Sequence, residues 1–172
     1  LGMSKTGITL DENMQSWMTI GHDQAGNVVP LWDLPSLAGA GALRSDVTDM
    51  LVFGAANAGP AETPLEHAMR DSHEEQRRIN EGMSVGMNWF NLHVGDDEII
   101  WHNGGTGGFR SFTGFDPARN VGVVVLTNSA HGADDIGFHL LNKAIPLTKA
   151  PVKRIEVDVS TEILETYVGV YA

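Results

Sequence analysis

The 172-residue sequence contains no cysteine and few basic residues. The lack of cysteine excludes disulfides, thiolate metal sites and cysteine nucleophiles, and it is compatible with either a reducing or an oxidising compartment. Eleven Lys and Arg residues stand against 22 Asp and Glu residues, so the net charge is -11. No cluster of basic residues forms a patch for phosphates, and nucleic acid is therefore not an expected partner.

Long apolar runs are also missing, and none approaches the length that crosses a bilayer. The first residues show no charged segment followed by an apolar one, so no signal peptide can be read. What is present is a hydrophobic fraction of 42% in a chain of single-domain size. These values favour a globular domain with a core of its own.

The first quarter of the chain is rich in Gly and Pro, and residues 1–43 predict long ordered loops with short elements. Ser45 as the N-cap and apolar residues at helical spacing predict a helix over Asp46–Asn57. A second helix is predicted over Ala61–Ser72, with Leu65 facing inward. The charged run Glu74–Arg78 then reads as a solvated loop or helix end.

From residue 84 the apolar period becomes that of strands. Strands are predicted over Met87–Val94, Glu98–Trp101, Arg110–Phe115 and Val121–Thr127, with turn residues between them. Successive hairpins predict an antiparallel sheet, and the last strand is so apolar that both its faces should be covered. A helix over Asp134–Ile145, with Ile136 and Leu140 among its apolar residues, would lie on this sheet. The predicted fold class is therefore α/β, of the α+β type.

Composition changes after Pro146, where Lys and Pro residues suggest a linker. Residues 161–172 predict a short helix that runs into a strand whose partners are missing. We therefore expect one domain over residues 1–146, and a linker with the start of a further domain over residues 147–172.

A glycine-rich segment, Trp101-His102-Asn103-Gly104-Gly105-Thr106-Gly107-Gly108-Phe109, connects two predicted strands. Small residues allow a substrate to approach the backbone, and outward amides can stabilise an oxyanion. A tight connection between paired strands explains the glycines equally well. A P-loop is excluded, because no Gly-Lys-Ser/Thr follows and the next element is a strand.

Matching segments in a fixed order carry a resemblance to a known family. They are Leu1-Gly2-Met3-Ser4-Lys5-Thr6, Leu37–Ser45 followed by Asp49, His102-Asn103-Gly104 with Thr106 and Gly108-Phe109, and Phe115–Asn128. Together they resemble the serine β-lactamase and penicillin-binding-protein superfamily, above all the class C β-lactamase-like esterases and peptidases. In that family Lys-Thr-Gly, or His-x-Gly in many esterase-like members, occupies the position of His102-Asn103-Gly104. The resemblance covers about residues 1–145 and implies a β-lactamase/transpeptidase-like fold.

Two motifs of that family are missing from this sequence. Its members acylate a serine in Ser-x-x-Lys and use a Tyr-x-Asn or Ser-x-Asn residue in proton transfer. No lysine here has a serine three residues before it, and neither Tyr167 nor Tyr171 has Asn two residues on. Both motifs precede the Leu-Gly-Met segment in the family. We therefore expect the C-terminal portion of a serine hydrolase, inactive alone, whose partner is the missing N-terminal half of the domain.

The resemblance also implies roles for individual residues. His102 occupies the Lys or His position that lines the pocket and helps to orient the proton-transfer partner, and its charge depends on pH near neutrality. The backbone amide of Gly105 takes the position of half the oxyanion hole. The implied substrate-binding residues are Asn103, Gly104, Thr106, Asn128 and Gly41. The implied substrate is a small-molecule ester, amide or β-lactam, with no cofactor, and the implied location is periplasmic or secreted, with the cytoplasm as the alternative.

Two other interpretations stay open at this point. Gly82-Met83-Ser84-Val85-Gly86 spells the nucleophile elbow of α/β-hydrolases, although an elbow needs a strand before the serine and a helix after it. The second is a non-catalytic binding or scaffold module derived from the β-lactamase-like fold. The histidines show no compact ligand spacing, so no metal site is expected.

Overall fold

The computed structural model of this chain describes residues 1–149 and 157–169. Its centre is an antiparallel sheet of six strands in the order of the sequence. The strands are β3 (Arg77–Asn80), β4 (Met83–Val85), β5 (Phe90–Val94), β6 (Asp97–Thr106), β7 (Phe109–Asp116) and β8 (Val121–Thr127). Because each strand pairs with the next along the chain, hairpin connections position every strand.

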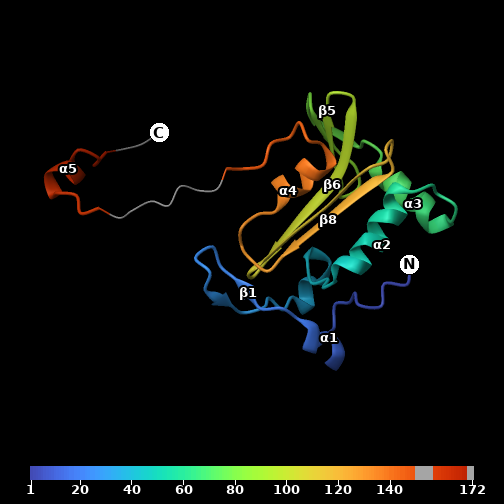
Figure 1. Cartoon of the computed structure of the whole chain (residues 1–172), viewed down its shortest axis with the longest axis horizontal. Coiled ribbons are helices and arrows are strands. Elements are labelled where there is room, and N and C mark those ends of the chain that lie inside the picture. The colour runs from blue at the N-terminus through green and yellow to red at the C-terminus, as the bar shows by residue number, and fades with distance from the viewer. Residues whose placement is uncertain (150–156, 170–172) are drawn as a thin grey trace.

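Helices cover both faces of this sheet (Figure 1). Helices α2 (Val47–Ala58) and α3 (Pro64–His73) lie on one face, and α4 (Asp134–Leu141) lies on the other. Successive strand residues point to opposite faces, so Ile100 packs with Ala58 and Phe115 under α2, while Ile99 packs with Phe112 and Leu141 under α4. The sheet therefore separates two small cores.

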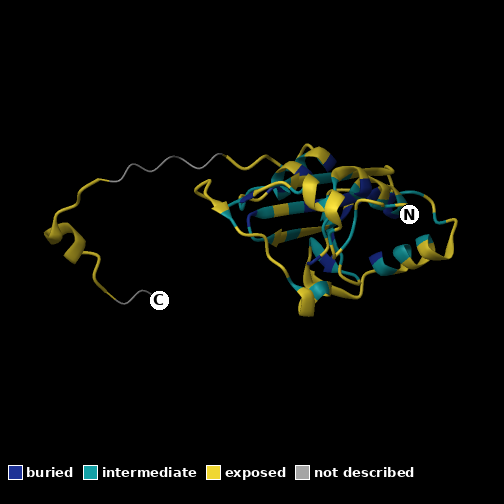
Figure 2. Ribbon diagram, turned by 90° about the horizontal axis from the view of Figure 1, so that it is seen from below, coloured by how far each residue is buried: buried dark blue, intermediate teal, exposed yellow. Residues whose placement is uncertain are grey.

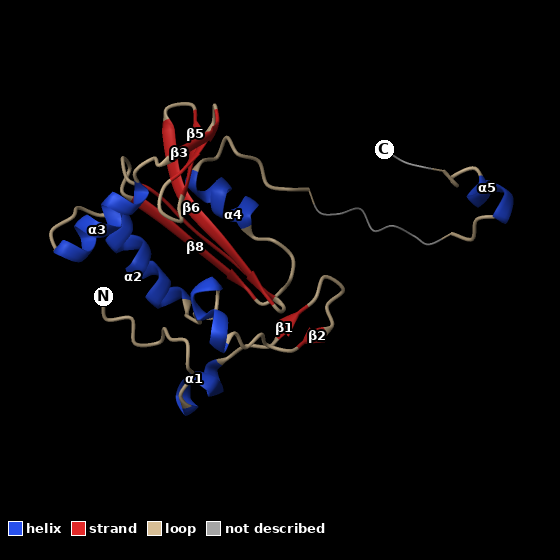
Figure 3. Cartoon of the chain, turned by 180° about the vertical axis from the view of Figure 1, so that it is seen from behind, coloured by secondary structure: helices blue, strands red, loops and turns tan. Residues whose placement is uncertain are grey.

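The first 43 residues form short elements at one end of the sheet (Figure 3). These elements are α1 (Glu12–Trp17), β1 (Gly21–His22), β2 (Val28–Val29) and the 3-10 helix η1 (Pro35–Ala40). The backbone N–H of His22 donates to the carbonyl oxygens of Gly108 and Asn128, at 3.2 and 3.0 Å. The β1–β2 hairpin is thus attached to the ends of β7 and β8, and the predicted ordered loops with short elements are confirmed.

Most of the predicted elements are confirmed. Strand β8 has the predicted bounds, and α2 and α4 contact its two faces. Helix α2 is shifted by one residue, and its N-cap is Asp46 rather than Ser45, because the Asp46 carboxylate accepts from the Asp49 N–H. Helix α3 begins only at Pro64, where Thr63 and Glu66 form a capping box.

Other predictions were wrong in part. Residues Glu74–Gln76 form the exposed helix end and loop that the charged run predicted, but Arg77 and Arg78 already belong to β3, an exposed strand that pairs with β4. The sequence of this edge strand does not alternate between apolar and polar residues, and that alternation is the pattern that predicts a strand. Leu65, expected to face inward, is 51% exposed.

Helix α4 stops at Leu141, and the residues expected to supply its apolar surface do not all face the sheet. Ile136 and Leu140 are 45% and 50% exposed. The contact side carries Gly137, where a Cβ atom would overlap the ring of Phe112, together with Phe138 and Leu141. A glycine lets the helix approach the sheet closely, and composition alone cannot reveal that contact.

After α4 the chain continues to the short helix α5 (Thr161–Glu165), as expected for the tail. All described residues of the tail from 157 to 169 are exposed (Figure 2). The end of the strand expected there lies at residues 170–172, outside the described residues. In the described part of the chain, no helix combines the length and apolar character that a membrane span requires.

A buried carboxylate attaches the N-terminal segment to α2. Asp49 is 6% exposed, and its Oδ2 accepts from the Lys5 N–H and the Thr6 hydroxyl, both at 2.7 Å. The Thr6 and Ser45 hydroxyl oxygens are also 2.7 Å apart. These contacts hold residues 5–7 against the start of α2, because a buried carboxylate is costly without its donors.

Asp49→Ala should therefore lower the free energy of unfolding by about 2–3 kcal/mol, since it leaves the Lys5 N–H and the Thr6 hydroxyl without their acceptor. Asp49→Asn should lower it less, because a single amide oxygen can still accept both bonds. Urea denaturation of both variants measures this difference. Equal losses would show that the acceptor is not the stabilising feature.

A buried histidine ends α3. His73 is 6% exposed, and its Nε2 lies 2.9 Å from Oδ1 of Asn57, whose amide in turn donates to the Phe53 carbonyl oxygen. The His73 ring packs against Phe115, with 4.9 Å between ring centroids. Burial, with a smaller contribution from the charge of Arg70, lowers the pKa of His73 to about 4.

The folded state therefore resists protonation of His73, whereas the unfolded chain accepts the proton near pH 6.5. The stability that this residue contributes should be complete above pH 6.5 and decline as the pH falls to about 4, by about 2–3 kcal/mol. Urea denaturation across this range measures the loss. His73→Gln should flatten the profile, while His67→Gln, at an exposed position of the same helix, should leave it unchanged.

Candidate active site

The candidate site lies along the second half of β6. Strand β5 pairs with β6 only as far as Trp101, whereas β7 pairs with it up to Thr106. Within the described residues, the edge of β6 from His102 to Thr106 thus has no neighbouring strand on the β5 side. An uncovered edge presents backbone donors and acceptors at a fixed spacing, which suits the binding of a carbonyl-containing ligand.

The glycine-rich segment is part of this strand. We expected a loop between two strands, but β6 continues to Thr106 and only Gly107 and Gly108 form the turn. Gly108 has φ +76°, and a Cβ atom there would lie 2.6 Å from the His22 nitrogen. The prediction was wrong because pairing with β7 stabilises glycines that have low strand propensity in isolation.

The two-residue turn decides which backbone groups face the open edge. Thr106 and Phe109 close the hairpin, and the pair next to such a turn is hydrogen-bonded. Pairs alternate along an antiparallel ladder, so the N–H and C=O groups of Gly105 and Asn103 point away from β7. The carbonyl oxygen of Asn103 accordingly lies 2.5 Å from the His102 ring. The Gly105 amide is therefore directed toward the open edge.

His102 lies on the same edge with an exposed side chain. Its ring stacks on Phe90 at 5.7 Å between centroids, and Nδ1 faces the Asn103 carbonyl oxygen. Because a carbonyl oxygen only accepts, Nδ1 carries the proton of the neutral ring. The lone pair of Nε2, for which the described residues supply no partner, is then free to accept a proton or a hydrogen bond.

The predicted substrate-binding residues divide between the two faces of β6. Thr106 comes close to Gly41, whose φ is +141° and whose Cβ position would lie 4.0 Å from the Thr106 methyl group. Asn103 points to the other face, where its amide donates to the Asp134 carboxylate at 2.5 Å. At Gly104 a Cβ atom would lie 2.7 Å from the Ser111 hydroxyl, so a side chain at this position requires the Ser111 side chain to move.

Asn128 lies apart from this group, at the end of β8. Its side-chain amide donates to the Ile20 carbonyl oxygen at 2.9 Å, and its backbone carbonyl oxygen accepts from the His22 backbone N–H. The side chain attaches the β1–β2 hairpin to the sheet. The structure thus brings His102, Gly105, Thr106 and Gly41 together at one edge of β6. Asn128 lies outside this group, at the end of β8.

Two charged residues beside the site were missed by the sequence reading. Arg110 pairs with Gly105 across the β6–β7 hairpin, and Asp134 begins α4 next to Asn103. Arg110 could have been found from the register of β6 against β7, because the residue opposite Gly105 lies on the same face of the sheet. That register depends on the turn at Gly107-Gly108, which was not predicted.

Ser84, the serine of the possible nucleophile elbow, lies in β4 and is fully buried. The chain continues from β4 into β5 and not into a helix. An elbow exposes its serine between a strand and a helix, so this interpretation is wrong. Within residues 1–149 and 157–169, no three His, Asp or Glu side chains gather as a metal-binding group.

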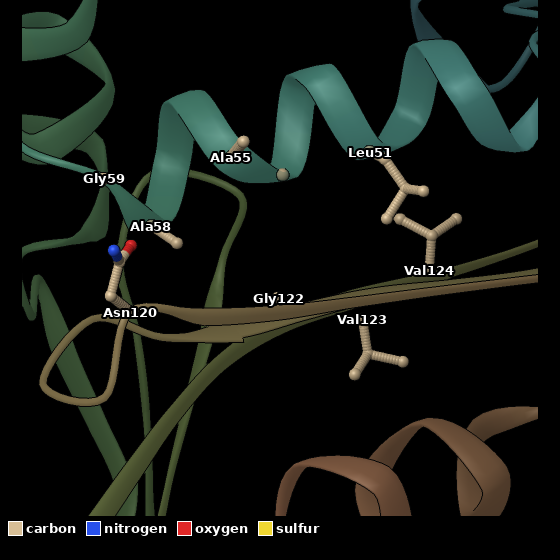
Figure 4. A pocket seen from close by; sticks show the side chains of 9 residues that line it. Leu51, Ala55, Ala58, Gly59, Asn120, Gly122, Val123 and Val124 are labelled. Carbon is tan, nitrogen blue, oxygen red and sulfur yellow. The ribbon is translucent and has the colours of Figure 1, made fainter.

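A cavity lies away from the site, between α2 and the first half of β8. It measures about 510 Å³ and is lined by small and apolar residues. Figure 4 shows Leu51 and Val124 pointing toward each other across it, while Val123 points to the opposite face of the sheet. The cavity has no titratable lining residue and offers no group for acyl transfer.

Solved structures share this fold. A class C β-lactamase in complex with cefoxitin superposes with a TM-score of 0.72 at 16% identity, over 83% of this chain and 49% of that one. A D-alanine carboxypeptidase from Burkholderia cenocepacia gives 0.66 at 22% identity, over 74% and 46%. The six-stranded sheet with its helices is therefore a part of the β-lactamase/transpeptidase-like fold.

Sequence comparison points the same way. The chain is 24% identical to a β-lactamase of Pseudomonas fluorescens, over 74% of this chain and 45% of the relative. It is 25% identical to an unguisins hydrolase of Aspergillus campestris, over 96% and 34%. The chain thus spans less than half the length of either relative. Because a family model described as β-lactamase matches residues 1–144, the chain belongs to the β-lactamase family of serine hydrolases.

Proposed function

We propose that this chain is the C-terminal part of a serine acyl hydrolase and supplies one wall of its active site. The observation that supports this proposal is the direction of the Gly105 amide, toward the open edge of β6 and beside His102. A serine from the missing part would attack an ester, amide or β-lactam carbonyl. The Gly105 amide would hydrogen-bond the oxyanion, which collapses as the bond to the alcohol or amine breaks and that group takes up the serine proton. Water would then hydrolyse the acyl-serine ester and restore the serine.

His102 would act through Nε2, since Nδ1 is held by the Asn103 carbonyl oxygen. From an exposed position at the strand edge, Nε2 can orient the hydroxyl or amine that takes the serine proton. Thr106 and Gly41 would contact the substrate at the end of β6. Gly104 would keep the strand close to its neighbour, and Asn103 and Asn128 would position the strand and the adjacent hairpin.

The missing N-terminal part should pack on the side of α2 and the N-terminal segment. The N-terminal segment and α2 contain large apolar residues that are at least 48% exposed, namely Trp17, Ile20, Trp32, Leu37, Leu43, Val47 and Leu51. Exposed apolar residues in such number mark a surface that another part of a protein covers. We propose that the segment with Ser-x-x-Lys docks here, and that residues 147–172 lead into a further domain.

The isolated 172 residues should therefore form no covalent adduct with a fluorescent penicillin and should not hydrolyse a chromogenic ester. A longer protein that includes the upstream Ser-x-x-Lys should do at least one of these. Gel fluorescence and ester turnover of the two proteins provide the measurement. Labelling of the isolated chain would place a nucleophile within it and contradict the proposal, whereas an inert longer protein would favour a non-catalytic module.

In the longer protein, His102→Ala should lower kcat/KM for its ester or amide substrate by roughly tenfold to a thousandfold, because proton transfer loses its orienting group. His67→Ala, at an exposed position on α3, is the matched control and should leave kcat/KM unchanged. If the His102 variant keeps the wild-type kcat/KM, the residue has no part in the mechanism.

A further inference from the structure

Arg110 occupies the space that a side chain at position 105 would need. Its guanidinium lies so close to Gly105 that a Cβ atom there would overlap Nη1. The two residues are cross-strand partners in the β6–β7 hairpin, and both face α4. Because Gly105 has no side chain, Arg110 can lie across β6 in the direction of the open edge of that strand.

The guanidinium is held in this position by the segment that follows β8. Nε of Arg110 donates to the Ala130 carbonyl oxygen at 3.3 Å, and the Ala130 N–H donates to the His22 carbonyl oxygen at 2.8 Å. Nε is thus anchored on the β8 side while Nη1 reaches β6. The side chain spans the hairpin and ends beside the peptide whose amide faces the site.

Arg110 has no carboxylate partner. Across the described ranges, Arg110 forms no ion pair, in contrast to Arg119 and Arg78, which bind Asp116 and Glu75 at 2.7 and 2.6 Å. Asp134 accepts from the neutral Asn103 amide and forms no ion pair with Arg110. A cation beside a developing negative charge stabilises it, and because the Arg110 side chain is exposed, water screens part of this effect.

We propose that Arg110 is a positioning residue of the oxyanion hole. Its guanidinium supports the Gly105 peptide from the α4 side and places a positive charge beside the oxyanion that the Gly105 amide binds. When the serine oxygen bonds to the carbonyl carbon, the serine proton passes to the base of the missing part and the π electron pair of the carbonyl moves onto the carbonyl oxygen. The negative charge on this oxygen is the charge that Arg110 stabilises. The inference rests on the proposed acyl transfer at Gly105.

The charge effect is tested in the longer protein with the upstream serine, using a neutral chromogenic ester. Arg110→Gln should lower kcat about tenfold with little change in KM, because the charge acts on the transition state and not on the neutral ground state. Arg110→Lys should recover part of this loss. Arg77→Gln, on the exposed edge strand β3, is the control and should keep the wild-type kcat.

The outcomes separate the two proposals. An active wild-type enzyme whose Arg110→Gln variant keeps its kcat would overturn the role of Arg110 and leave acyl transfer at Gly105 intact. A loss that appears in KM alone, or that Arg110→Lys does not reduce, would also overturn it. An inactive wild-type enzyme would refute the proposed function itself.

The positioning is tested without activity, by a double-mutant cycle on thermal unfolding. Gly105→Ala should lower Tm by several degrees, because the new methyl group displaces the guanidinium. In the Arg110→Ala background the same substitution should cost much less. Additive changes in Tm would show that the two residues are not in contact and would overturn the proposed support of the Gly105 peptide.

Discussion

The pairing of β6 with β7 across the Gly107-Gly108 turn is the constraint on which the site depends. A two-residue turn allows only one register, and a shift by one residue would exchange the two faces of β6. Ile99 and Asn103 would then face α2 instead of α4. The same shift would turn the Gly105 amide inward, toward β7. One hairpin therefore determines both the packing of the core and the direction of the amide.

The turn is stabilised in its place by contacts far away in the sequence. A Cβ atom on Gly107 would lie 2.6 Å from the Trp32 ring, and one on Gly108 would lie 2.5 Å from Val29. The first segment of the chain is attached in turn to α2 by Asp49. The wall of the site thus consists of two distant parts of the sequence, and neither has a large core of its own.

The sequence predicts this fold best where one physical signal dominates. The Val-rich run of β8 has the predicted bounds, because β-branched residues favour strands, and α2 and α4 contact its two faces although none of its residues is fully buried. The exposed strand β3 has no such signal, since only its backbone pairing with β4 makes it a strand. In α4, Gly137 contacts the sheet because the ring of Phe112 fills the space of a side chain there. The spacing of apolar residues along the helix does not predict this contact.

For the candidate site, motif order predicted His102 and Gly105, and the structure places both on the part of β6 that has no neighbouring strand on the β5 side. Arg110 was not identified, since its relation to Gly105 is a cross-strand contact. Such a contact is predictable only after the turn residues are known. The sequence offers two glycine pairs for the turn, Gly104-Gly105 and Gly107-Gly108. A residue whose role depends on strand register can be predicted only after the pairing of the strands is known.

The two faces of the sheet differ in how completely they are covered. The α4 face holds a cluster of aromatic rings, in which Trp101 and Phe138 are 4.7 Å apart and Phe112 and Phe138 are 4.9 Å apart. The α2 side is packed less completely. Leu51 and Val124 point toward each other across a cavity between α2 and β8, and Val47 and Leu51 are both 48% exposed. Large apolar side chains that stay this exposed mark a surface that another part of a protein covers. This incomplete packing is why we propose that the part carrying the nucleophile docks on the side of α2.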